Sequence, residues 1–317
     1  MAEVRPFEPG DADRAAELLF QVFPASIQTA ASLRHRQVSE PPRARRKSWV
    51  ALEGNELIAF ATANFAWFGS EAGKGRIWVG VHPQHRRRGI GTYLWDTAVA
   101  QLAGAKRLTV EIDDDPAGLR FVEQRGFTQY DSEVISRLDP GEGELETKPH
   151  EGFRVLPLGE LRGRERDLYE FYGEAGAVPP GDPENRVTLD EWRDFVLGNP
   201  LLDDEGSVVV LDAEDRVASL SWLLVDHSRR RAENEWTATL PQLRGRGLAR
   251  LAKGATIRWA AERGLTEIVT GNDPDNLPMR ELNRRLGYKE LFLRRDLELG
   301  SRRPEEPGEF SERLHDP

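Results

Sequence analysis

The chain has 317 residues, no cysteine and a formal net charge of −10 at pH 7. Without cysteine it can form no disulfide, no thiolate-bound zinc site and no acyl-cysteine intermediate. The acidic balance argues against a general nucleic-acid-binding protein, which is normally basic, and the length is typical of two domains of about 100–200 residues each.

The sequence predicts neither a targeting segment nor a metal site. Met1–Gly10 contains no apolar run, and the longest uncharged apolar stretch, Leu57–Ser70, is shorter than the ~18–20 residues that cross a bilayer. Among the histidines only His82 and His85 lie close in sequence, and no third ligand accompanies them. We therefore expect a cytoplasmic protein that uses no metal and no membrane.

Apolar patterns predict a series of strands and helices in the first half of the chain. Strands are indicated by short runs rich in β-branched and aromatic residues, and a helix by apolar residues that recur every four positions from Ile90 to Leu102. The predicted strands are Trp49–Leu52, Leu57–Phe65, Ile77–Val81 and Leu108–Ile112, and the predicted helices are Ile90–Leu102 and Leu119–Arg125.

A polar segment separates this half from a second, similar series. Residues 139–151 read DPGEGELETKPHE, a composition typical of a linker, and residues 300–317 resemble it, which predicts a frayed tail. We therefore divide the chain into domains at 1–138 and 152–299. In the second domain the predicted strands are Ser207–Asp212, Val217–Val225, Glu235–Leu240 and Glu267–Thr270, and the predicted helices are Leu248–Trp259 and Met279–Leu286.

One motif occurs in both halves. Residues 83–91 read PQHRRRGIG and residues 241–249 read PQLRGRGLA, so the second copy follows the first by 158 residues (from 83 to 241). At the same offset of 158 residues Trp78 matches Trp236. At an offset of 161 residues (from 126 to 287) Gly126-Phe127 matches Gly287-Tyr288, so about three residues are inserted in the second copy. A match in register over this length indicates an internal repeat whose period is the size of a domain.

Each copy of the motif joins the end of a predicted strand to the start of a predicted helix. Glycines there let backbone N–H groups approach a ligand closely, and the helix N-terminus and the arginines supply positive charge, which predicts a cradle for phosphate or pyrophosphate. The loop matches neither the Walker A pattern nor G-x-G-x-x-G. The cradle residues are Arg86, Arg87, Arg88, Gly89, Ile90, Gly91 and Thr92 in the first copy and Arg244, Gly245, Arg246, Gly247, Leu248, Ala249 and Arg250 in the second.

Both copies resemble the acetyl-coenzyme A signature of the GNAT N-acetyltransferase superfamily, R-x-x-G-x-G/A after a strand. The family's downstream N-x-x-A/M element is similar to Asn276–Met279, and Asp115 replaces that asparagine in the first half. The resemblance covers nearly the whole chain outside the linker and tail. It implies a tandem of α/β (α+β) domains, each a mixed, mostly antiparallel, splayed sheet flanked by helices.

The resemblance also implies where acetyl-CoA binds as a co-substrate. Its pyrophosphate would lie on the loop amides, near Asn276 in the second half. Its pantetheine arm would pair with the backbone of the preceding strand, at Val79 and Val81 or at Thr237 and Thr239. One amide of this strand would stabilise the thioester oxygen. Because the chain has no cysteine, a substrate amine would attack the thioester directly.

Acidic residues distinguish the two halves. Residues i and i+2 of a strand share a face, so Glu233 and Glu235 are expected on one face together with Thr237 and Thr239. The equivalent first-half positions contain no acid. Glu235 is therefore the candidate general base and Glu233 the second candidate, whereas the alternative interpretation of Glu235 is an exposed strand residue.

No candidate general acid is evident. The family often places a tyrosine in the last helix to protonate the leaving thiolate, but here the equivalent positions hold Val122 and Asn283. Asn283 is a further candidate catalytic residue that hydrogen-bonds without being an effective acid, so water, the proton of the amine or another tyrosine would have to substitute. Tyr169 and Tyr172, on an early helix of the second domain, are candidates to line the acceptor cleft.

We expect an N-acetyltransferase that acts on a primary amine of a small molecule, with a catalytic second domain and a degenerate first domain. The acidic balance favours a cationic acceptor such as an aminoglycoside, polyamine or amino-sugar. The alternatives are a protein or peptide N-acetyltransferase and a regulatory protein that binds acyl-CoA without turnover. The sequence leaves the oligomeric state open.

Overall fold

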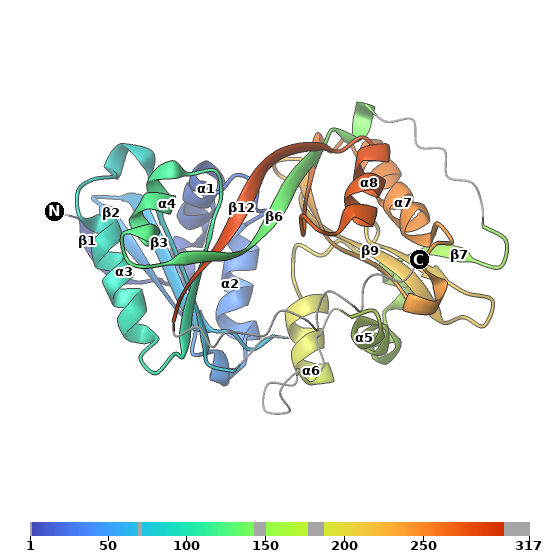
Figure 1. Ribbon diagram of the computed structural model, residues 1–317, viewed down its shortest axis with the longest axis horizontal. Helices are drawn as coiled ribbons and strands as arrows, with labels where there is room; N and C mark the ends of the chain where they lie inside the picture. The colour runs from blue at the N-terminus through green and yellow to red at the C-terminus, as the bar shows by residue number, and fades with distance from the viewer. Residues whose placement is uncertain (1, 69–71, 143–149, 177–186, 301–317) are drawn as a thin grey trace.

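The computed structural model describes residues 2–68, 72–142, 150–176 and 187–300, and their strands form one twelve-stranded sheet (Figure 1). The strand order is β1-β2-β3-β4-β5-β12-β6-β11-β10-β9-β8-β7. Neighbouring strands are antiparallel except that β4 is parallel to β5 and β10 to β11. The prediction of a mixed, mostly antiparallel sheet is therefore confirmed.

The eight predicted strands and four predicted helices lie close to their expected positions, and the structure contains further strands and helices that the apolar patterns did not predict. The first half contains β1 (Glu3–Pro6), α1 (Ala12–Val22), α2 (Ala30–Ser39), β2 (Lys47–Glu53), β3 (Glu56–Phe65), β4 (Lys74–Val81), α3 (Ile90–Gln101), β5 (Arg107–Ile112), α4 (Pro116–Glu123) and β6 (Thr128–Leu138). The second contains β7 (Arg154–Pro157), α5 (Glu165–Glu174), α6 (Leu189–Trp192), β8 (Val208–Leu211), β9 (Val217–Asp226), β10 (Arg231–Thr239), α7 (Leu248–Glu262), β11 (Glu267–Asn272), α8 (Leu277–Arg285) and β12 (Lys289–Gly300).

The two halves exchange their last strands. The final strand of the chain, β12, lies between β5 and β6 of the first half, while β6 pairs on its other side with β11 of the second half. Figure 1 shows β6 and β12 running together through the middle of the molecule. The sheet is thus continuous across the halves, and the domain limits 1–138 and 152–299 stay a prediction. Residues 143–149 of the expected linker and 301–317 of the expected tail lie outside the described residues.

Apolar packing also joins the halves. In the first half, α1 and α3 bury Leu18 and Leu94 in separate clusters. A further cluster combines first-half residues such as Trp67 with second-half residues such as Trp192 and Trp222. The relative position of the halves is therefore fixed by a shared core as well as by the shared sheet. Within the described residues, every helix is too short or too polar to span a bilayer.

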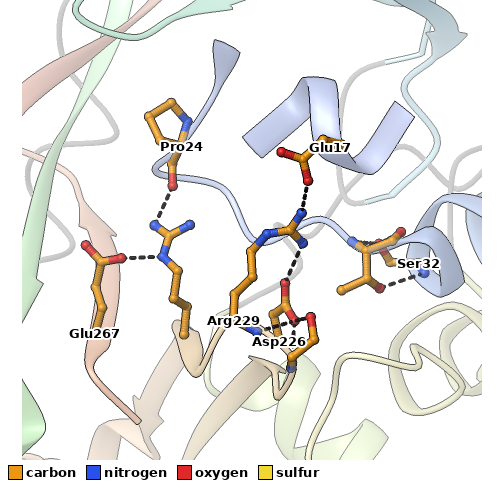
Figure 2. Close-up of polar contacts among 9 residues, drawn as sticks. Glu17, Pro24, Ser32, Asp226, Arg229 and Glu267 are labelled. Atoms are coloured by element: carbon orange, nitrogen blue, oxygen red, sulfur yellow. Dashed lines mark hydrogen bonds and ion pairs between the residues drawn. The ribbon is translucent and has the colours of Figure 1, made fainter. Parts of the chain in front are cut away.

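Arginines hold the β9–β10 hairpin of the second half against the first half. Arg229 donates to Glu17 of α1 at 2.7 Å and to Asp226 at 3.1 Å (Figure 2). Arg231 donates to the carbonyl of Pro24 at 2.6 Å and pairs with Glu267. These contacts bring the segment after α1 to the start of β10, the strand that carries the candidate base.

Candidate functional site

The two glycine-rich loops have the same backbone geometry. In the first copy, φ is +65° at Arg87 and +81° at Gly89, and in the second it is +75° at Gly245 and +79° at Gly247. The first arginine of each loop donates a hydrogen bond from its Nε–H to the last backbone carbonyl of the preceding strand. In the first copy Nε of Arg86 lies 3.2 Å from the carbonyl oxygen of Val81. The second copy repeats this bond from Arg244 to Thr239 at 3.4 Å.

Each loop leads directly into a helix whose first N–H groups have no intrahelical partner. Gly89 caps α3 and Gly247 caps α7, both in the left-handed conformation that favours glycine. A side-chain carbon at Gly89 would meet no other atom within 4 Å, whereas one at the equivalent Gly247 would meet Nε2 of His150 at 3.2 Å, so the surface is open above the first loop and His150 lies beside the second. The geometry fits an anion such as a pyrophosphate on both loops.

The sheet opens beside each loop. The parallel pairing of β4 with β5 covers only Lys74–Arg76, and that of β10 with β11 covers only Arg231–Glu233. Beyond these residues the strands separate, and in the described part of the chain no strand pairs with the free edge of Val79–Val81 or Thr237–Thr239. The expected splay is present, and the free backbone edges can accept an extended ligand arm.

A β-bulge at Glu235 distinguishes β10 from β4. In β10, Asn234 pairs with Leu223 and Trp236 pairs with Trp222, so Glu235 has no partner on β9. The equivalent pairing of β4 with β3 is regular. The extra residue reverses the alternation of side chains, and the prediction that Glu233 shares a face with Thr237 and Thr239 is therefore wrong. Both threonine hydroxyls instead bond to serines of β9.

Glu233 and Glu235 form a hydrogen-bonded carboxyl pair. Oε2 of Glu233 also accepts the backbone N–H of Ile27, a first-half residue, at 3.2 Å. Burial and the neighbouring charge of Glu235 raise the pKa of Glu233 to about 8. By accessible surface Glu235 is an exposed residue of β10, as the alternative interpretation expected. The protein around it nevertheless raises the pKa of Glu235, whereas Arg36, Arg294 and the hydrogen bond from Glu233 act in the opposite direction. The pair therefore retains a proton near neutral pH, and Glu235, which lines the cavity, is the member placed to accept a further proton from a ligand.

A cavity of about 660 Å³ lies between the two halves. This volume is typical of a site for a small molecule. Glu235 lines the cavity, and so does Tyr172 of α5, as the sequence suggested, whereas Tyr169 donates its hydroxyl to the carbonyl of Val187. The lining carries both signs of charge, from Arg36, Glu40, Arg46, Lys74, Arg76, Glu111, Glu235, Arg294 and Asp296. Sequence reasoning missed most of these residues because α2 and β12 carry no motif of the repeat.

The asparagines of the second half are engaged in local contacts. Asn276 accepts the N–H of Met279 at 3.2 Å and caps α8, as Asp115 caps α4 through the N–H of Ala117 at 3.0 Å. Asn283 is buried and donates to Asn272 at 2.5 Å. Asn283 does not line the cavity among the residues described. The structure therefore gives no support to Asn283 as a residue that contacts the reacting atoms. No cluster of metal-ligating side chains occurs in the described ranges.

Comparisons with known proteins agree with this geometry. The model of the acetyltransferase (GNAT) family matches residues 13–127 and 166–288. A mycothiol acetyltransferase of Kocuria rhizophila is 27% identical over 291 residues, which cover 84% of this chain and 93% of the relative. A mycothiol acetyltransferase of a Nocardioides species is 24% identical over 289 residues, covering 87% and 90%.

Solved structures share the fold over nearly the full chain. A tandem GNAT protein from the clavulanic acid biosynthesis pathway aligns with a TM-score of 0.73 at 18% identity, covering 94% of this chain and 98% of that one. A GCN5-related N-acetyltransferase from Sphaerobacter thermophilus aligns with a TM-score of 0.69 at 18% identity, covering 94% and 95%. At these identities the likeness establishes the fold.

Proposed function

Because this chain belongs to the acetyltransferase (GNAT) family, we propose that it transfers the acetyl group of acetyl-CoA to a primary amine of a small molecule in the cavity between its halves. The observation that carries the proposal is Glu235, which lies at the bulge of β10, lines the cavity and is hydrogen-bonded to a second carboxyl. The relatives named mycothiol acetyltransferase also favour a small-molecule acceptor.

The residues around the second loop have the properties that acetyl-CoA binding requires. The amides of Gly245–Arg250 would hold the pyrophosphate at the start of α7. The open edge of Thr237–Thr239 would pair with the pantetheine arm, and a backbone N–H of β10 would stabilise the negative charge that develops on the thioester oxygen.

Proton transfer falls to Glu235. Its carboxylate accepts the proton as the amine nitrogen forms a bond to the thioester carbon, and the carbon–sulfur bond breaks to release the thiolate. Glu233 keeps its proton and donates to Glu235, while the N–H of Ile27 holds Glu233 in place. The first half thus contributes to the geometry of the base in the second half.

The first half retains a loop of the same shape but lacks the base. Ile77 stands at the position equivalent to Glu235, and β4 has no bulge. We therefore assign coenzyme binding without turnover to the first loop and catalysis to the second.

Release of free thiol from acetyl-CoA in the presence of a panel of amines tests the proposal. Glu235→Gln should lower kcat/KM by about 10²–10⁴-fold near neutral pH, while acetyl-CoA affinity stays nearly unchanged. Glu290→Gln, at an exposed site on β12, is the matched control. Full activity of Glu235→Gln would reject Glu235 as the base, and silence of the wild type with every class of amine would reject the acetyltransferase proposal.

A further inference from the structure

Arg36 of α2 is a charged residue of the cavity wall without a partner. It lines the cavity, yet within the described residues it makes no hydrogen bond and no ion pair. Its neighbours differ in this respect. Arg34, on the same helix, pairs with Asp13 at 2.6 Å, and Arg46 pairs with Glu40 at 2.6 Å. Arg46 thus engages Oε1 of Glu40, while Oε2 of Glu40 has no hydrogen-bond partner among the described residues.

An enclosed guanidinium without a partner is energetically unfavourable. Burial accordingly lowers the pKa of Arg36, and the nearby charge of Arg46 acts in the same direction. The negative charges that act on Arg36 belong to Glu235, Glu40 and Glu233, but within the described residues none of the three carboxyls forms an ion pair with its guanidinium. Because none of these carboxyls contacts its guanidinium and the residue lines the cavity, Arg36 is free to bind a ligand.

We propose that Arg36 binds an anionic group of the acceptor, namely a carboxylate, while Glu235 receives the proton of the acceptor's amine. The acceptor is then an amine that also carries a carboxylate, as a free amino acid does. The planar guanidinium matches a carboxylate through paired hydrogen bonds. This inference rests on the proposed function and makes its substrate class specific.

The charges that line the cavity differ from the charge of the whole chain. The expectation of a purely cationic acceptor followed from the net charge of the whole chain. The cavity itself is lined by Arg36 of the first half, which has no partner among the described residues, and by Glu235 of the second half. These two opposite charges are complementary to a zwitterion.

The remaining wall of the cavity is rich in aromatic rings. The ring of Tyr172 lies 5.7 Å from that of Trp222 and 4.7 Å from that of Trp236, measured between centroids. All three residues line the cavity. Such a surface suits an apolar or aromatic side chain on the acceptor.

The test compares the standard L-amino acids with their amides, which keep the amine and lack the carboxylate, as acceptors in the thiol-release assay. We expect the wild type to prefer at least one large apolar amino acid over its amide by about 10- to 100-fold in kcat/KM. Arg36→Met should abolish this preference by slowing acetylation of the amino acid and leaving the rate with the amide unchanged. Arg34→Met, on the same helix and outside the cavity, should retain it.

The outcomes separate this inference from the proposed function. Acetylation of amides or simple amines as fast as amino acids would overturn the role of Arg36 and leave the acetyltransferase proposal intact. An equal loss with both acceptors in Arg36→Met would also overturn it, because a carboxylate contact cannot affect an amide. If no amine is acetylated, calorimetric titration with the same amino acids tests the role of Arg36 directly. Binding to the wild type that is lost in Arg36→Met supports the inference, and absence of binding to the wild type rejects it.

Discussion

Lys253 of α7 offers a quantitative test of how the second half differs from the first. Its side chain is 2% exposed, and its Nζ lies 5.1 Å from the centre of the Tyr288 ring. The equivalent first-half residues are Trp95 and Phe127, an apolar pair with ring centroids 5.4 Å apart. The second half has therefore placed a lysine at a position that is apolar in its counterpart.

Burial lowers the pKa of Lys253 from 10.5 to about 7. The folded state thus binds this proton less tightly than the unfolded state, so the lysine costs stability at and below pH 7, and the cost vanishes as pH rises above the unfolded value of 10.5. With ~1.4 kcal/mol for each pKa unit, the full cost is on the order of 5 kcal/mol. Lys253→Met keeps the length of the side chain and removes this cost.

We expect Lys253→Met to raise the free energy of unfolding by several kcal/mol at pH 6, and the difference to shrink steadily towards pH 10. Urea denaturation of both proteins at a series of pH values measures it, with Lys289→Met as a control because that lysine is highly exposed. A variant that is less stable at all pH values, or a difference that does not change with pH, would refute the lowered pKa of Lys253 in the folded state.

Two further predictions concern the loops and the carboxyl pair. Gly247→Asp should weaken the binding of coenzyme A to the second half, and Gly89→Asp should weaken its binding to the first half. Each substitution places a negative charge and a strained left-handed residue where the pyrophosphate is expected. Calorimetry that finds binding unchanged in both variants would reject the anion cradle. Glu233→Gln should remove the inflection near pH 8 from the pH profile of kcat/KM, since the pKa of Glu233 is raised to about 8, and an inflection that persists in this variant would assign that titration to another group.

Local sequence signals determined most of the strand and helix positions and both loops. The glycines at 89 and 247 mark left-handed residues at helix starts, and this requirement acts within a few residues of the chain. The repeat of PQHRRRGIG as PQLRGRGLA likewise reports a local structure used twice, with the same arginine-to-carbonyl bond in each copy. Apolar runs were sufficient to predict β3 and β9 because these strands are buried along most of their length, and apolar residues at every fourth position were sufficient to predict α3 because this helix buries one face.

Only the tertiary structure decided how these parts combine. The exchange of β6 and β12 depends on pairing between strands far apart in the chain, and the bulge at Glu235 appears only in the register of β10 against β9. Strict alternation along β10 therefore predicted the wrong face for Thr237 and Thr239. The N–H of Ile27 reaches Glu233 across 206 positions of sequence, and Arg36 comes from a helix with few buried residues and hence little periodicity. The charges that define the cavity meet because the halves pack together, and no local pattern in either half encodes that meeting.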